Sequence, residues 1–133
     1  MAAPGETDLV QMLATLRVDR RPEVYTYVAV DVPTPGLLAA AAAMVDEGEL
    51  TTLVVPVEAA TRAGLPVVIE LAWLTLAVHS SLDAVGLTAA VSGRLAEHNI
   101  ACNVLAGYHH DHLLVPNSRA DDALAALAPT VRT

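Results

Sequence analysis

The sequence predicts an α+β fold in which helices cover one face of an antiparallel sheet. Three patterns in residues 73–116 support this fold class: an apolar strand at Trp73–Val78, an amphipathic helix, and two strands joined by a turn. Strand, helix and hairpin in this order form the first three-quarters of a ferredoxin-like βαββαβ unit. We therefore expect this stretch to be the most regular part of the chain.

The helix of this stretch is predicted from about residue 83 to residue 98. Leu87, Val91 and Leu95 lie four residues apart and form one apolar stripe on a helical period. Asn99 follows the helix, and asparagine tolerates the left-handed conformation that ends many helices. The stripe is expected to pack on the sheet.

Two strands follow this helix, Ile100–Ala106 and His110–Val115, and a turn at Gly107 and Tyr108 is expected to join them. Cys102 lies inside the first of these strands, where a small buried thiol is the commonest role of a free cysteine. Because the chain has a single Cys, an intrachain disulfide and a multi-cysteine metal motif are excluded.

The rest of the chain shows shorter patterns. Thr7 is a suitable N-cap for a helix that ends near Leu16, and Arg17–Pro22 has the composition of a charged connector. Ser118 and Asp121 form a capping-box pattern at the start of the last helix. The other predicted elements are a strand at Val24–Asp31, a helix at Leu37–Val45, a strand at Leu50–Val55, a helix at Val57–Ala63 and a long strand at Pro66–Val78.

Two small lobes in one body are expected, residues 1–66 and residues 67–133, because no low-complexity linker divides the chain. The second lobe needs a fourth strand, and only Thr130–Thr133 remain for it after the last helix. The first lobe shows fewer strands than a complete unit. We therefore expect it to borrow an element from the second lobe.

Charge and apolar runs exclude several classes of function. Seven basic residues stand against fifteen acidic ones, which gives a net charge of -8 without a basic cluster. Phosphate contacts supply most of the affinity for nucleic acids, so neither a nucleic acid nor an anionic membrane surface is an expected partner. The N-terminus lacks a signal-peptide pattern, and the most apolar run, Leu65–Val78, is too short to span a bilayer. A cytoplasmic protein is expected.

Gly86 carries the clearest sign of a binding site. It falls in the first turn of the predicted helix, where glycine costs about 1 kcal/mol relative to alanine. One explanation is a ligand carboxylate held by first-turn N–H groups and the helix dipole. The other explanation is close packing against the adjacent lobe, with no ligand.

The polar residues near Gly86 also have two possible roles, a structural one and contact with a ligand. Ser80, Ser81 and Asp83 are typical helix caps, but Asp83 could instead face the amino group of an amino acid. Asn103 lies in a strand among apolar neighbours, and a buried amide needs hydrogen-bond partners. It either bonds the backbone at a bulge or contacts the ligand.

Histidines in and near the hairpin permit a metal site. Strand alternation places His110 and His112 on one face, and His109 and Asp111 on the other. His79 ends a strand that is expected to lie beside them. Two or three imidazoles with a carboxylate can hold zinc, nickel or iron. The alternative is a polar edge in which each ring bonds a backbone carbonyl or Asp111.

No catalytic constellation is visible. The sequence lacks a serine nucleophile elbow, a glycine-rich phosphate loop and paired carboxylates in an apolar context. A triad of Ser80, His79 and Asp83 would require directions that a tight strand-to-helix corner does not easily allow. Neither an enzyme nor a cofactor is therefore expected.

These motifs resemble those of small bacterial ACT-domain proteins. The resemblance rests on GETDL at Gly5, on WLTLAVHSSLDAVGLTAAVSGRLAEHNIACNVLAGYHHDHLLVP at Trp73, and on the closing Ala-Leu helix, so it covers nearly the whole chain. More distantly, the chain is similar to the ACT pairs of eukaryotic arginine sensors. The resemblance implies two tandem βαββαβ lobes that bind an amino acid or another small metabolite between neighbouring lobes and regulate another protein.

The expected function is that of an amino-acid sensor without catalytic activity, working as a homodimer whose lobes pair edge to edge. A ligand-free assembly subunit and a metal-binding protein are the alternatives. The candidate ligand-binding residues are His79, Ser80, Ser81, Asp83, Val85, Gly86, Leu87, Asn103 and Tyr108, the last either at a pocket rim or in packing. The metal candidates are His110, His112 and His79.

Overall fold

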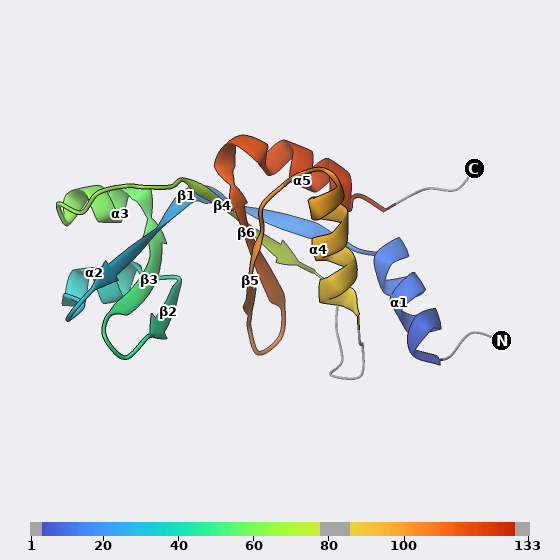
Figure 1. Ribbon diagram of the computed structural model, residues 1–133, viewed down its shortest axis with the longest axis horizontal. Helices are drawn as coiled ribbons and strands as arrows, with labels where there is room; N and C mark the ends of the chain where they lie inside the picture. Colours follow the sequence, from blue (N-terminus) through green and yellow to red (C-terminus); the bar gives the residue numbers. More distant parts are fainter. Residues whose placement is uncertain (1–3, 78–85, 130–133) are drawn as a thin grey trace. The chain divides into compact units, whose positions relative to one another are not determined.

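The computed structural model describes residues 4–77 and 86–129. The chain forms two compact units, one of residues 1–20 and 73–133 and the other of residues 21–72. The elements in Figure 1 are α1 (Pro4–Ala14), β1 (Val18–Val30), α2 (Pro35–Ala40), β2 (Ala43–Asp46), β3 (Thr51–Pro56), α3 (Val57–Arg62), β4 (Leu71–Leu76), α4 (Leu87–Glu97), β5 (Asn103–Ala106), β6 (Asp111–Pro116), η1 (Asn117–Arg119) and α5 (Ala120–Leu127). None of the described helices is long and apolar enough to cross a membrane.

The unit at 21–72 is a three-stranded sheet with two short helices. Its strands follow the order β2–β3–β1, and both pairings are antiparallel. α2 and α3 contact each other and pack on β3. The core between helices and sheet consists of Val28, Leu37, Leu53, Val55 and Ala60. This is the predicted α+β arrangement.

The other unit contains the most regular stretch of the chain. β4, β6 and β5 are neighbours in that order, and α5 contacts both β6 and α4. The apolar stripe of α4 is buried as predicted, because Leu87, Val91 and Leu95 are each at most 2% exposed. Asn99 adopts a φ of 59°, which confirms it as the left-handed residue after the helix.

The fourth strand of this unit comes from the beginning of the chain. β1 is the neighbour of β4, and the Ala77 N–H donates to the Arg17 carbonyl at 2.7 Å. Arg20 fixes this segment to the same unit, because its guanidinium contacts Asp121 at 3.3 Å and Asn117 at 3.2 Å. The order β1–β4–β6–β5 is that of a ferredoxin-like unit. The predicted charged connector is therefore wrong: most of it is strand.

Three further predictions are also wrong. Thr7 lies inside α1 and is not its N-cap. The helix predicted at Leu37–Val45 is divided into α2 and the strand β2, because β2 pairs with β3 and this pairing outweighs the helix propensity of alanine. The long strand predicted from Pro66 begins only at Leu71.

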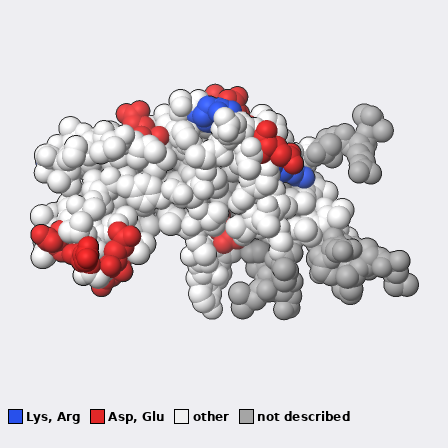
Figure 2. All heavy atoms as spheres, in the orientation of Figure 1, with Lys and Arg blue, Asp and Glu red and all other residues white. Residues whose placement is uncertain are grey.

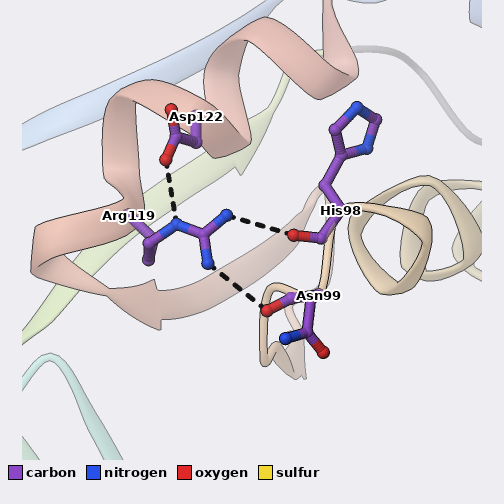
Figure 3. A network of polar contacts seen from close by, with 4 residues as sticks. All are labelled: His98, Asn99, Arg119 and Asp122. Carbon is purple, nitrogen blue, oxygen red and sulfur yellow. Dashed lines mark hydrogen bonds and ion pairs between the residues drawn. The ribbon is translucent and has the colours of Figure 1, made fainter.

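Arg119 joins the end of α4 to the start of α5 (Figure 3). Its guanidinium donates to the carbonyl of His98 at 3.1 Å and to that of Asn99 at 3.4 Å, and its Nε pairs with Asp122 at 2.9 Å. These carbonyls belong to the helix end, which has no intrahelical donors for them. The capping box predicted at Ser118 is wrong, since Ser118 lies in η1 and Arg119 is the N-cap of α5.

Candidate functional site

The predicted binding site lies at the residues just before α4, and the structure describes it only from Gly86 onward. His79, Ser80, Ser81, Asp83 and Val85 lie outside the described residues, so their roles stay predictions. The helix itself begins at Leu87, four residues later than expected.

Gly86 is the N-cap of α4 and not a member of its first turn. Its φ is 100°, in the left-handed region that glycine enters without a steric penalty. A Cβ at this position would lie 3.4 Å from Cδ2 of Leu9 in α1, which is an ordinary contact distance. The backbone conformation therefore explains the glycine, and the predicted helical cost at this position does not arise.

The first turn of α4 presents backbone N–H groups that no carbonyl of the helix accepts. Leu87 is 2% exposed, so its side chain belongs to the core and only its backbone can face a ligand. Gly86 has no side chain with which to cap the helix. The corresponding helix of the other unit differs, because Thr34, the N-cap of α2, accepts the N–H of Leu37 at 3.2 Å. Of these two N-cap residues, only Thr34 caps its own helix.

Asp111 of β6 lies beside this first turn. The hydroxyl of Thr88 in α4 donates to Oδ2 of Asp111 across 3.5 Å, and Asp111 is half-buried. The sequence pattern linked Asp111 only to the histidines. Strand alternation placed it on the face opposite His112, and the structure confirms this, because Asp111 contacts α4 whereas His112 contacts β4. The sequence reasoning therefore missed that Asp111 lies beside the start of α4, at the candidate site.

Asn103 and Tyr108, both predicted to contact a ligand, are exposed. Asn103 begins β5, which is the last strand in the sheet order, and lies opposite Leu114 of β6. The expectation of a buried amide is wrong, because the start of an edge strand stays open to solvent on one side. Tyr108 is 97% exposed, so it is not a packing residue of the core, and its ring makes an edge contact with His109 at 4.7 Å.

His112 is held by two side chains of β4. Its Nδ1 lies 3.2 Å from Nε1 of Trp73 and 2.9 Å from Oγ1 of Thr75. An indole N–H can only donate, so Nδ1 must be the acceptor and the ring carries its proton on Nε2. Nδ1 of His112 is thus engaged by Trp73 and Thr75, so this nitrogen cannot coordinate a metal ion while these hydrogen bonds are present.

The other hairpin histidines do not complete a metal site. The N–H of Gly107 donates to the carbonyl of His110 at 2.9 Å and closes the turn, which leaves His109 exposed at its tip. The rings of His109 and His110 lie 6.4 Å apart. Within residues 4–77 and 86–129, no three or more His, Cys, Asp or Glu side chains are placed to hold a metal ion. His79 lies outside these ranges.

Cys102 is a free, half-buried thiol that immediately precedes β5. The strand predicted from Ile100 starts three residues later, so Cys102 is not inside it. Burial raises the pKa of the Cys102 thiol, because desolvation disfavours the thiolate.

Solved structures share this fold. A protein of unknown function from Vibrio cholerae, suggested to be a transport protein, is 37% identical, with a TM-score of 0.84 over 96% of this chain and 99% of its own. The regulatory subunit of aspartate kinase from Thermus thermophilus is 13% identical, with a TM-score of 0.60 over 91% of this chain and 99% of its own. Aspartokinase III of E. coli, solved with aspartate and ADP, is 16% identical, with a TM-score of 0.55 over 84% of this chain and 32% of its own. The last two similarities show the fold alone.

Models of protein families also match the sequence. One model of the ACT domain matches residues 4–71 and a second matches residues 68–129. A search of curated proteins gave no match. The predicted division into residues 1–66 and 67–133 stays a prediction. Two matches in tandem span almost the whole described chain, and the chain therefore belongs to the ACT-domain family.

Proposed function

We propose that this chain is a regulatory protein that binds an amino acid at the start of α4 and has no catalytic activity of its own. The proposal rests on the first turn of α4. Its N-cap residue, Gly86, has no side chain that could cap the N–H groups of this turn, and the carboxylate of Asp111 lies beside the turn. Helix N-termini bind carboxylates, and a carboxylate binds an ammonium group. The two features therefore match the two charged ends of an amino acid.

The predicted corner completes this proposed site. Ser80, Ser81 and Asp83 precede Gly86 in the sequence, flanked there by His79 and Val85, and the proposal is that their polar groups contact the ligand. Asn103 and Tyr108 are exposed on the β5–β6 hairpin, and the proposal is that a ligand or a second copy of the chain contacts them there.

A homodimer in the cytoplasm is the proposed working form. β2 and β5 are the outermost strands in the sheet order, and β2 exposes Met44 by 57% and Val45 by 49%. Apolar edge strands pair readily with another chain. This observation also favours a second candidate function, a ligand-free assembly subunit.

A thermal-shift screen with the twenty amino acids tests the proposal. A ligand at 100 times its Kd adds about 2.7 kcal/mol of stability, which raises Tm by roughly 5–10 °C. Asp111→Asn should weaken binding of the stabilising amino acid about tenfold, whereas Glu97→Gln, at the far end of α4, should not change it. A flat screen at millimolar concentrations would reject amino-acid binding and support the assembly subunit. In that case Val45→Lys should dissociate the dimer in light scattering.

A further inference from the structure

The unit at 21–72 carries a pocket that the proposed function does not use. Its volume is about 500 Å³, within the range of roughly 300–1,000 Å³ that is common for small-molecule sites. A second pocket of the same unit, beside α2 and α3, measures only about 220 Å³. The apolar lining of the larger pocket comes from Val28 and Ala29 of β1 and from Leu65, Pro66 and Val68 before β4. Such a lining suits a hydrocarbon body.

Among the described residues that line this pocket, Glu47 is the only charged one. The hydroxyl of Thr52, which also lines the pocket, donates to Oε2 of Glu47 and so orients the carboxylate. An ionised carboxylate accepts about four hydrogen bonds, so this one bond leaves capacity for a ligand. Tyr27 lines the pocket too, and aromatic residues attract cations.

The charge of the surrounding unit favours the same kind of ligand. Residues 21–72 contain seven acidic side chains and two arginines. Neither arginine lines the larger pocket: Arg62 pairs with Glu58 at 2.6 Å, and Arg21 contacts the hydroxyl of Tyr25 at 3.3 Å. Figure 2 shows acidic side chains gathered around β2 and β3 on the face in view. An anionic ligand would therefore be repelled.

We infer that this pocket binds a small organic cation with an apolar body, such as an arylalkyl amine. Glu47 accepts hydrogen bonds from the ammonium group, and the apolar side chains cover the hydrocarbon. A zwitterionic amino acid is a poor ligand here, because its carboxylate would approach that of Glu47. The ligand class thus differs from that of the α4 site, and the inference does not depend on the proposed function.

Calorimetric titration of the full chain with 2-phenylethylamine tests this inference, with 2-phenylethanol as a neutral ligand of the same size. The amine should bind with one-to-one stoichiometry and at least tenfold more tightly than the alcohol. Glu47→Gln should weaken amine binding about tenfold, or about 1.4 kcal/mol, without changing the affinity for the alcohol. Glu49→Gln removes the same charge from the same hairpin but lies outside the pocket lining, so it should bind the amine as the wild type does.

A second variant tests the apolar part of the pocket. Ala29 is exposed, so Ala29→Phe can fill the pocket without disturbing the core, and it should weaken binding of both ligands at an unchanged Tm. Equal amine affinities for Glu47→Gln and Glu49→Gln would show non-specific binding to the acidic surface and overturn the inference. Absence of amine binding at millimolar concentration would overturn it too. Asp111→Asn should leave amine binding intact, which separates this result from the α4 site.

Discussion

The indole N–H of Trp73 donates a hydrogen bond to Nδ1 of His112 over 3.2 Å, with the two ring centroids 5.2 Å apart. The bond joins β4 to its neighbour β6. Gly107 leaves room for the imidazole, because a Cβ there would lie 3.1 Å from Nε2 of His112. His112, one of the three histidines considered as metal ligands, is therefore a structural acceptor for a buried donor.

His112→Leu should destabilise the protein by about 1–3 kcal/mol, because it removes this acceptor from an indole N–H in a residue that is only 3% exposed. Urea unfolding followed by the fluorescence of Trp73, the single tryptophan of the chain, measures the change. His109→Ala, at the exposed tip of the turn, should stay within about 0.5 kcal/mol of the wild type. Equal stabilities of the two variants would show that the hydrogen bond contributes nothing.

Arg119→Ala should cost about 1–2 kcal/mol, because it removes hydrogen bonds to the carbonyls of His98 and Asn99 together with the ion pair to Asp122. Arg62→Ala is the matched control. Arg62 also pairs with a carboxylate, but its side chain is 74% exposed, against 36% for Arg119. Exposed pairs of this kind contribute little, so Arg62→Ala should change stability by less than about 0.5 kcal/mol. Chemical denaturation compares both, and a larger loss for the Arg62 variant would contradict the assignment.

Gly86→Ala and Gly93→Ala should change stability in opposite directions. Gly86 has a φ of 100°, so alanine there is strained and should cost about 1–2 kcal/mol. Gly93 lies inside α4 with nothing within 4 Å of its added Cβ, so alanine should stabilise by about 0.5–1 kcal/mol through helix propensity. Thermal unfolding by circular dichroism measures both. Stabilisation by Gly86→Ala would contradict the left-handed conformation. The bulkier Gly86→Val is expected to abolish amino-acid binding.

Cys102 should react slowly with iodoacetamide near neutral pH, because burial raises the pKa of its thiol and the thiolate is the reactive form. The free energy of folding that depends on the neutral thiol should be fully present below the ordinary thiol pKa of the unfolded chain, and should be lost as pH rises through the raised pKa of the folded chain. Alkylation rates measured from pH 7 to pH 10, with the urea-unfolded chain as the control, test this. Equal rates for folded and unfolded chain at pH 8 would be inconsistent with the raised pKa.

The sequence alone determined the elements whose signals are local. The stripe of Leu87, Val91 and Leu95 defined the buried face of α4, and Asn99 defined its end. α3 lies between Pro56 and Gly64 as predicted, because proline favours a helix start and glycine the left-handed residue after its end. The hairpin of β5 and β6 followed from its strand patterns and its turn. These signals are set by residues a few positions apart.

Only the tertiary structure decided which segments complete the sheet and which groups meet at the start of α4. Arg20 is in a strand, and Met44 is in β2 instead of a helix, because the hydrogen-bond partners of a strand come from distant segments. Asp111 lies beside Thr88 for the same reason, since β6 and α4 meet only after the chain has folded. The sequence therefore determined the elements with local signals, and long-range backbone pairing determined how they make a sheet and a candidate site.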